Sequence, residues 1–319
     1  MKRGLVFFHY FEADTRYREN LVFFLSAAYR DDLDFAVVIS GHCSVNLPKL
    51  SNVAYVFTEN KNNDFGGYVA ALAQLRNRLD GYDYFLFVNS SVRGPFLARP
   101  SGASWVEPFV SRFSDEVQLV GSSIAILVGD SEYTERFRQL YPYPGPYSHV
   151  QTTAYALTSQ ALRHLLDVGF YDIHARLDKL DVICHYEIRL SLEILRAGWN
   201  IKACLEKYNG LDYRLEHTDI NPSSRNGDPL YKRAYFGKTA SPHELVFAKT
   251  NRRLMSLTQL SWATLRGLFG IRHPAILGWD EYRRLRAVYL AKVLLLPVTE
   301  LKRSLDRAVR QTRDLLQPR

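Results

Sequence analysis

Polar side chains that could bind or activate an oxygen-rich substrate lie at three places along the chain. The first holds two carboxylates, Asp181 and Glu187, close to the start of a predicted helix over residues 186–197. A carboxylate in such a place can act as a general base that takes a proton from a hydroxyl group. The alternative is structural, because an acidic residue in the first turn of a helix also stabilises the helix dipole.

The second place is the polar run ENKNNDFGG at residues 59–67, between a predicted strand and a predicted helix. Asp64 can accept hydrogen bonds from a ribose or from a base edge. Gly66 and Gly67 let the backbone approach a ligand at a helix N-terminus, where anions are favoured. The alternative is a capped turn, since Asn and Asp are ordinary residues before a helix.

The third place follows the apolar strand YFLFV at residues 84–88, which ends in Asn89, Ser90 and Ser91. Three small polar side chains at the carboxyl end of a buried strand suit a diphosphate group or its metal ion, and Arg93 adds a positive charge. The alternative is a turn stabilised by the serine hydroxyls and ended by Pro95.

Several familiar catalytic motifs are absent from the sequence. There is no GxxxxGK[ST], no GxGxxG after the first strand, no HExxH and no GxSxG, which weighs against P-loop, dinucleotide-binding, zinc-protease and serine-hydrolase functions. The three cysteines are widely spaced and odd in number, so they predict neither a disulfide framework nor a metal knuckle. A reducing cytosol is the expected compartment.

The elements that must position these residues alternate between strands and helices. Apolar runs predict strands at residues 4–11, 35–40, 53–57 and 84–88, and helical spacing predicts helices within residues 13–30 and 67–79. This order predicts an α/β fold with a doubly wound, mostly parallel sheet, in which ligands bind beyond the carboxyl ends of the strands. Further on, we expect one or two strands within residues 117–128, a helix over 158–166, a strand over 201–205, loops over 209–241 and a helical tail from about His243.

The charge of the chain is unevenly distributed. The formal net charge is +8, yet residues 251–319 carry 14 Lys+Arg and 5 Asp+Glu, which leaves residues 1–250 close to neutral. We therefore expect two parts, a domain over residues 1–250 and a basic amphipathic helical region over residues 251–319. A basic segment of this kind indicates a polyanion or an anionic lipid surface as partner.

Membrane-spanning and secretory segments are not predicted. The apolar start of the chain is interrupted by His9 and Glu12, which is not typical of a signal peptide. The longest apolar stretch, residues 287–298, contains Lys292 and Pro297 and is shorter than the roughly 20 residues that cross a bilayer. We expect a soluble or surface-bound protein.

The order of the motifs resembles GT-A-type glycosyltransferases related to bacterial polysaccharide and rhamnan synthesis proteins. The resemblance covers about residues 4–253 and rests on ENKNNDFGG, YDYFLFVNSSVRGPF, HVQTT before a predicted strand, YEIRLS and PHELVFAKTN. It implies the GT-A fold, a Rossmann-like, mostly parallel sheet with flanking helices, here followed by a helical tail. It also implies a nucleotide-sugar donor, expected to be a UDP-sugar, and a glycan or lipid-linked glycan acceptor.

By the same resemblance, a donor-binding set lies at the strand ends. Asp64, with Glu59 and Asn60, would meet the base and ribose, and residues at the end of the first strand would border the base. For the first strand the alternative is core packing, because aromatic residues are mostly buried. The full donor set is His9, Tyr10, Glu59, Asn60, Lys61, Asp64, Gly66, Asn89, Ser90, Ser91 and Arg93.

GT-A enzymes usually end the strand that matches YFLFV with Asp-x-Asp, which binds Mn²⁺ or Mg²⁺. This chain has Asn89-Ser90-Ser91 there, and it therefore lacks the carboxylates that such hard cations prefer. Asn89 and Ser91 would complete a metal site only together with the diphosphate. Alternatively, Arg93 or Lys61 would supply the positive charge.

The resemblance also implies the catalytic and acceptor residues. Inverting GT-A enzymes often carry an acidic general base at a comparable helix start, which favours Glu187 over Asp181. A retaining enzyme would need no such base, and Glu187 would then position the substrate. His149 and Gln151, after a Pro- and Tyr-rich loop, are candidates for contacts to the acceptor sugar.

The C-terminal region has Trp and Leu side chains at helical spacing with arginines between them, as in helices that lie on anionic membranes. The alternative is a helical pair that packs on the domain or on a second subunit. Nucleic acid is not an expected partner, because its recognition signatures are missing.

The function expected from the sequence is therefore transfer of a sugar from a nucleotide-sugar donor to a growing bacterial cell-surface polysaccharide, such as O-antigen or capsule. The expected location is the inner, cytosolic face of the plasma membrane, with peripheral attachment. The alternative is a noncatalytic GT-A-like subunit that acts as a binding or scaffold partner in a polysaccharide synthesis complex.

Overall fold

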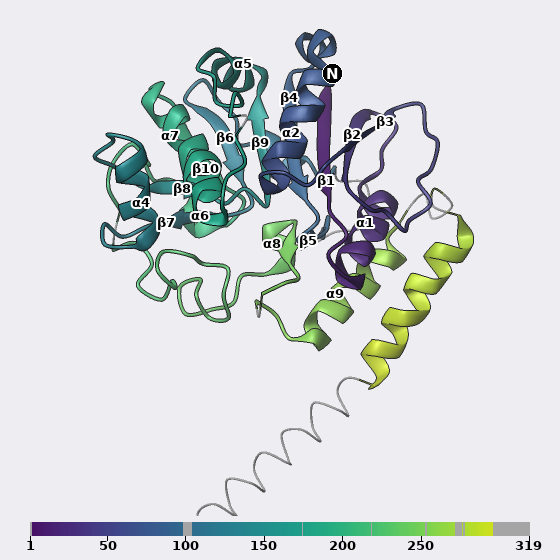
Figure 1. Ribbon diagram of the computed structural model, residues 1–319. Coiled ribbons are helices and arrows are strands. Elements are labelled where there is room, and N and C mark those ends of the chain that lie inside the picture. Colours follow the sequence, from purple (N-terminus) through teal and green to yellow (C-terminus); the bar gives the residue numbers. More distant parts are fainter. Residues whose placement is uncertain are drawn as a thin grey trace, which may run out of the picture.

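The computed structural model describes residues 2–97, 104–173, 175–217, 219–252, 254–271, 276 and 278–295. A seven-stranded sheet in the order β10-β6-β9-β4-β1-β2-β3 lies at the centre, flanked by helices (Figure 1). Its strands are β1 (Gly4–Tyr10), β2 (Leu33–Ser40), β3 (Val53–Thr58), β4 (Tyr84–Asn89), β6 (Val117–Gly121), β9 (Ala154–Thr158) and β10 (Asn200–Ala203). Strand β9 is antiparallel to both neighbours, and the other adjacent strands pair in parallel. The predicted α/β fold with a mostly parallel sheet is confirmed.

Continuous apolar runs are buried in the central strands of the sheet. Every residue of β1 is buried, and β4 is buried up to its last residue. Phe7 of β1 pairs in register with Phe87 of β4, which in turn pairs with Tyr155 of β9. Their rings are stacked, with centroids 4.8 and 4.9 Å apart. This aromatic row aligns three strands and holds their register relative to one another.

Most of the connections between strands contain a helix. Asp14 caps the first helix by accepting from the Arg16 amide, and Thr158 caps the helix after β9 by accepting from the Ala161 amide. The helices are α1 (Thr15–Ala28), α2 (Asn63–Gln74), α3 (Glu107–Val110), α4 (Glu132–Leu140), α5 (Ser159–Asp167), α6 (Lys179–Val182), α7 (Arg189–Arg196), α8 (Pro242–Leu245) and α9 (Leu257–Phe269), with 3₁₀ turns η1 (Arg76–Gly81) and η3 (Glu206–Tyr208).

Two small antiparallel sheets bring distant segments together. Strand β5 (Val92–Arg93) pairs with β11 (Ala248–Lys249), and β7 (Ile124–Ile126) pairs with β8 (Ser148–Val150). The predicted strand region 117–128 thus divides into β6 and β7, which belong to different sheets. The first small sheet places Lys249 next to Val92, just after the end of β4.

Two predicted helices differ in detail from the structure. The helix expected over residues 186–197 is preceded by α6 and a π-helical turn, η2 (Ile183–Ile188), so that α7 begins only at Arg189. The helix expected over 67–79 begins earlier, because Asn62 and Asn63 adopt left-handed φ angles of 53° and 54°, which Asn tolerates well. These shifts decide where Asp64 and Glu187 lie.

The C-terminal part begins with α8 close to the predicted position, but β11 separates it from the longer helices. Helix α9 and a helix over residues 279–295 follow, and both lie beside α1 (Figure 1). Within the described parts of the chain, no helix has the length and apolar character needed to cross a membrane.

Candidate functional site

A polar cluster lies at the carboxyl end of β4, where the last residue of the strand meets the start of α2. Asn89 donates from Nδ2 to Asp64 Oδ2 at 3.0 Å. Its Oδ1 accepts from the Ser91 amide at 3.1 Å and from Ser91 Oγ at 2.6 Å. We call Asp64, Asn89, Ser91, Glu187 and Lys249 the strand-end cluster. Parallel strands that end together place such residues at one edge of the sheet.

Asp64 reaches this edge because of the tight turn into α2. A Cβ atom on Gly66 would lie 1.8 Å from the Lys61 carbonyl oxygen, so only glycine allows the chain to fold back here. The Asn62 side chain ties the same turn to a neighbouring loop, since it donates to the Ala175 carbonyl and accepts from the Leu177 amide, both at 2.8 Å.

The surroundings of Asp64 oppose its negative charge. Burial raises the pKa of this carboxyl to about 6, and the Glu187 charge also raises it, against lowering contributions from the Asn89 hydrogen bond and the Lys249 charge. Asp64 and Glu187 are therefore close enough to repel each other. A carboxylate kept in an unfavourable place is typical of functional sites.

Glu187 projects from the π-helical turn η2, a kind of irregularity that is frequent at functional sites. Its Oε2 accepts from Thr152 Oγ1 at 3.2 Å, and its Oε1 lies 3.7 Å from His149 Nε2. The side chain is 28% exposed, so water and substrates can reach it. His149 Nδ1 lies 3.1 Å from the Tyr147 carbonyl oxygen and must donate to it, which leaves Nε2 facing Glu187.

Glu187 stays ionised although it is partly buried. Burial by itself would raise the pKa of this carboxyl, but interactions with His149, Lys249 and Thr152 outweigh it, and the pKa lies below its ordinary value. The two carboxylates of the cluster thus have pKa values shifted in opposite directions, an arrangement typical of paired acids with different roles.

Two cations complete the site, and sequence reasoning gave them no role. The Lys249 ammonium makes no hydrogen bond and no ion pair within 4 Å with the residues that the structure describes. Burial lowers its pKa, as does the Arg252 charge, whereas Glu187, Asp228 and Asp64 raise it. Arg252 is paired with Asp228. In the sequence, Lys249 is marked only by its place in the segment PHELVFAKTN. The pairing of β11 with β5 brings Lys249 to the cluster.

Several predicted donor residues are buried away from the cluster surface. His9 is 3% exposed, bonds Ser40 Oγ at 2.8 Å, and burial lowers its pKa to about 3. Tyr10 is also buried and donates to Glu12 Oε2 at 2.7 Å. Ser90 accepts from the Phe11 amide at 3.2 Å and supports the turn from below. These three side chains shape the site rather than line it.

Other predicted residues are engaged elsewhere. Glu59 is exposed and lies 3.5 Å from Arg176, while Asn60 and Lys61 are half-buried in the loop before α2. Arg93 is buried in a separate network with Glu19.

The same holds for Gln151 and Asp181. Gln151 is buried and accepts from Ser123 Oγ at 2.8 Å. Asp181 is held by Arg136 through contacts of 2.7 and 3.1 Å, and these hydrogen bonds lower its pKa. Glu187 and His149, not Asp181, are thus the residues that the fold brings to the cluster.

The residues at the end of β4 do not fit a divalent cation in this arrangement. Both lone-pair directions of Asn89 Oδ1 are used by Ser91, and among the described residues Asp64 is the one carboxylate that contacts Asn89 or Ser91. Nowhere among the described residues do three or more His, Cys, Asp or Glu side chains gather in a way that could hold a metal ion. Hard cations need several free oxygen ligands.

Several solved structures that resemble the chain are glycosyltransferases. Galactosyltransferase LgtC, in complex with donor and acceptor sugar analogues, is 15% identical over 57% of this chain and 69% of its own, with a TM-score of 0.30. The bifunctional glycosyltransferase WbbM is 12% identical over 63% of this chain and 38% of its own, with a TM-score of 0.34. Mannosyltransferase PcManGT from Pyrobaculum calidifontis, in complex with GDP-Man and Mn²⁺, is 11% identical over 97% of this chain and 82% of its own, with a TM-score of 0.34.

No protein-family model and no curated protein matches the sequence. Structural similarity of this size assigns no residue roles, which therefore depend on the contacts within this chain.

The unfavourable charge of Asp64 leads to a prediction about stability. Its folded pKa lies above the unfolded value of about 3.9, so the fold loses stability as the pH rises from about 4 through about 6. We expect Asp64→Asn to raise the free energy of unfolding at neutral pH by about 1–2 kcal/mol, and the gain to vanish near pH 4. Urea unfolding at both pH values measures it.

The exposed Glu59→Gln is the matched control, and it should change stability by less than about 0.5 kcal/mol at either pH. Equal or lower stability of Asp64→Asn at neutral pH would show that the Asp64 carboxylate is not disfavoured in the fold.

Proposed function

We propose that the chain is a glycosyltransferase that moves a sugar from a nucleotide-sugar donor, expected to be a UDP-sugar, to a hydroxyl group of a growing bacterial cell-surface polysaccharide. The observation that carries the proposal is the strand-end cluster, in which Asp64, Asn89 and Glu187 come from three elements and meet at one edge of the sheet. A fold that had lost its activity would have no reason to hold two repelling carboxylates together.

The donor diphosphate is the part of the substrate that Lys249 and Arg252 suit best. The two side chains carry like charges close enough for each to influence the other, and Lys249 has no ion-pair partner within 4 Å among the described residues. An anion beside them would relieve this repulsion and replace the metal charge that Asn89 and Ser91 do not attract. Asp64, at the start of α2, then accepts hydrogen bonds from the nucleoside.

Glu187 has the properties of the general base in a single displacement. It is ionised and accessible, and Thr152 with His149 fixes its direction. It takes the proton of the acceptor hydroxyl while the hydroxyl oxygen forms a bond to the anomeric carbon. The bond from that carbon to the diphosphate oxygen breaks, and the leaving diphosphate stays with the cations.

A peripheral membrane location is part of the proposal. Helix 279–295 buries one apolar face against α1, yet on its outer side it also exposes Leu290, Leu294 and Leu295, with Arg283 and Arg284 nearby. Apolar side chains flanked by arginines suit the inner leaflet of a membrane with anionic lipids. A lipid-linked acceptor would be presented at that surface.

The first test is calorimetric titration with UDP, GDP, CMP and dTDP, each with and without Mn²⁺. We expect one nucleotide to bind, and we expect Lys249→Met to weaken that binding at least about tenfold, because it removes the cation available to the diphosphate. Lys2→Met is the control, since Lys2 precedes β1 at the opposite end of the sheet and should leave the affinity unchanged.

If no nucleotide binds with or without Mn²⁺, the result would favour the alternative function, a noncatalytic subunit of a polysaccharide synthesis complex. Binding that depends strictly on Mn²⁺ and is indifferent to Lys249→Met would contradict the role of Lys249.

Glu187 gives the second prediction. Glu187→Gln should lower turnover at least about a hundredfold and leave nucleotide affinity within about twofold, because an amide keeps the shape but cannot accept the proton. The rate of nucleoside diphosphate release, with the donor type found by titration, measures turnover. Glu135→Gln, an exposed change on α4, is the control. A rate close to that of the unaltered protein would remove Glu187 from the role of base.

The membrane location gives a third prediction. The unaltered protein should sediment with phosphatidylglycerol vesicles and not with phosphatidylcholine vesicles, and Leu290→Asp with Leu294→Asp should abolish the binding. Val168→Asp alters an exposed apolar residue after α5 and serves as the control. Equal sedimentation of all three proteins would contradict attachment through this helix.

A further inference from the structure

Among the described residues, Arg93 is the largest charged side chain in the interior, with only 1% of its surface exposed. It lies in β5, directly after the turn that contains Ser90 and Ser91. Burying a guanidinium group is costly unless every donor finds a partner. The partners of Arg93 therefore show which parts of the molecule the turn depends on.

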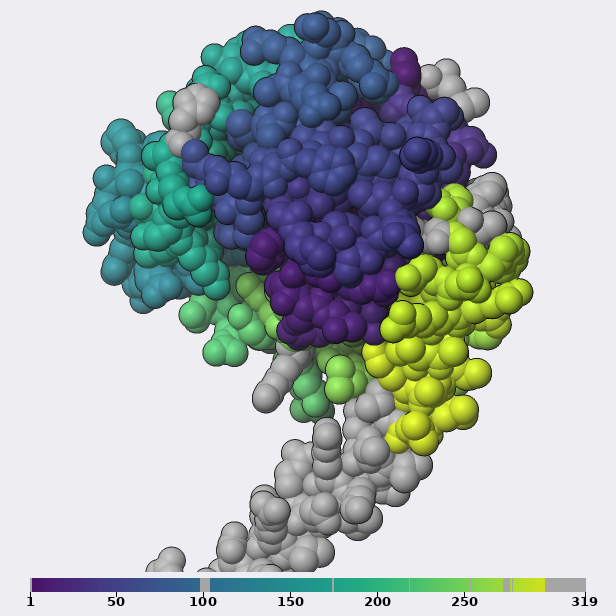
Figure 2. Space-filling model, turned by 45° about the vertical axis from the view of Figure 1, so that its right-hand side comes forward, coloured from purple at the N-terminus to yellow at the C-terminus, as the bar shows by residue number. Residues whose placement is uncertain are grey.

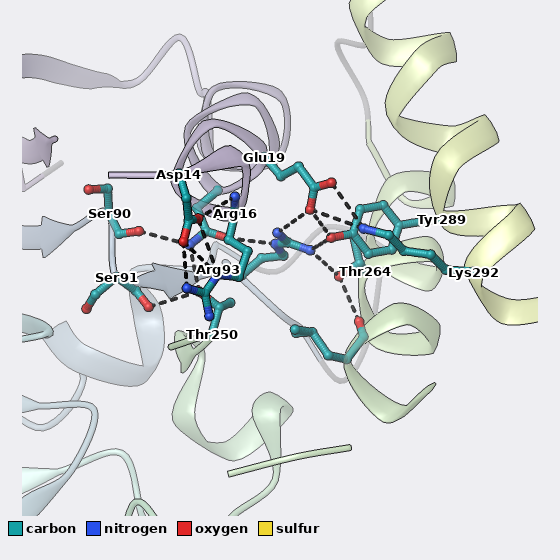
Figure 3. Close-up of polar contacts among 12 residues, drawn as sticks. Asp14, Arg16, Glu19, Ser90, Ser91, Arg93, Thr250, Thr264, Tyr289 and Lys292 are labelled. Carbon is teal, nitrogen blue, oxygen red and sulfur yellow. Dashed lines mark hydrogen bonds and ion pairs between the residues drawn. The ribbon is translucent and has the colours of Figure 1, made fainter. Parts of the chain in front are cut away.

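The guanidinium group connects three helices. Its Nε donates to Asn20 Oδ1 of α1 at 2.8 Å, and its Nη2 donates to Glu19 Oε2 at 3.1 Å. Its Nη1 donates to Thr264 of α9 and to the Tyr289 hydroxyl of helix 279–295 (Figure 3).

Asn20 connects Arg93 to the strand-end cluster. It is fully buried, and its Nδ2 donates to the Ser90 carbonyl oxygen and to Thr250 Oγ1, both at 2.9 Å. Thr250 in turn donates to the Ser91 carbonyl oxygen from its amide at 3.0 Å and from its hydroxyl at 3.1 Å. Ser91 binds Asn89, and Thr250 directly follows Lys249. The positions of Asn89 and of Lys249 therefore both depend on the hydrogen bonds of the Asn20 amide group.

The C-terminal helix completes the network from the other side. Tyr289 donates to Glu19, and Lys292 Nζ lies 3.1 Å from Glu19 Oε1. Burial would raise the pKa of Glu19, but its hydrogen bond from Tyr289 and the charges of Arg93 and Lys292 lower it below the ordinary value. Arg18 and Glu281 form a further ion pair of 2.7 Å between the same helices. Figure 2 shows helix 279–295, in yellow, lying against the purple N-terminal part of the chain.

We infer that helix 279–295 is part of the apparatus that positions the strand-end cluster, with Tyr289 and Lys292 as positioning residues that act through Glu19, Arg93 and Asn20. When both contacts are lost, Glu19 keeps only its contact with Arg93 Nη2, and Arg93 Nη1 keeps only Thr264, among the partners that the structure describes. The guanidinium group then shifts, and Asn20 Oδ1 loses the hydrogen bond that it accepts from Arg93 Nε. Asn20 in turn holds the Ser90–Ser91 turn and Thr250 less firmly. The effect is local, because the aromatic row of the sheet does not involve these residues.

Amide hydrogen exchange of the full chain tests the inference without any ligand. In Tyr289→Phe combined with Lys292→Met, we expect the amides of residues 89–92 and 249–251 to exchange at least about tenfold faster, with the strands β1 and β4 unchanged. Tyr282→Phe is the matched control, since Tyr282 is buried on the same helix but donates to the Leu268 carbonyl, outside the network. Lys292→Arg alone, which keeps the charge and leaves Tyr289 intact, should show exchange as slow as that of the unaltered protein.

A second measurement rests on the proposed function. The double variant should bind the nucleotide found by titration at least about fivefold more weakly, whereas Tyr282→Phe should bind it as the unaltered protein does. If the unaltered protein binds no nucleotide, the proposed function fails, and the exchange experiment still decides the inference. Unchanged exchange in both segments, or equal acceleration throughout the chain, would overturn it.

Discussion

Everything at the candidate site depends on the parallel alignment of β1 and β4. Stacking of Phe7, Phe87 and Tyr155 across three strands excludes water from the middle of the sheet and determines the register of the strands. With the register determined, β4 has to end at Asn89, beside the first turn of α2. The hydrogen bond between Asn89 and Asp64 is then a consequence of strand alignment, and the polar cluster lies where the apolar core stops.

The charges at this edge explain why the cluster suits an anionic ligand and a proton transfer. Asp64 and Glu187 repel each other, and Lys249 and Arg252 do the same. Such an arrangement costs the protein stability and leaves unsatisfied charges that a ligand of complementary charge, such as the proposed donor diphosphate, would neutralise. The opposite pKa shifts of the two carboxylates have different causes. At Asp64 burial raises the pKa and outweighs the lowering by Asn89 and Lys249, whereas at Glu187 the interactions with His149, Lys249 and Thr152 outweigh burial.

The C-terminal helices have two different relations to the rest of the chain. Their inner faces supply Thr264, Tyr289 and Lys292 to a buried charge network, whereas the outer face of the last helix is apolar and basic. Arg93 links the two regions because it lies in a two-residue strand between the site and the network. This position explains how Arg93 can be close in sequence to Ser91 and yet point away from it, toward Glu19 and Tyr289 (Figure 3).

The sequence alone was sufficient for the α/β class and for the strand-end location of Asn89 and Asp64, because hydrophobic periodicity and strand-end polarity are local properties. Tertiary structure decided which polar residues share one site. Arg93, His9 and Gln151 have the right residue types but point inward, and Asp181 is taken by Arg136. Lys249, far away in sequence, joins the cluster through the pairing of β11 with β5. Side-chain direction and long-range pairing depend on packing between distant segments, and no local pattern in the sequence encodes that packing.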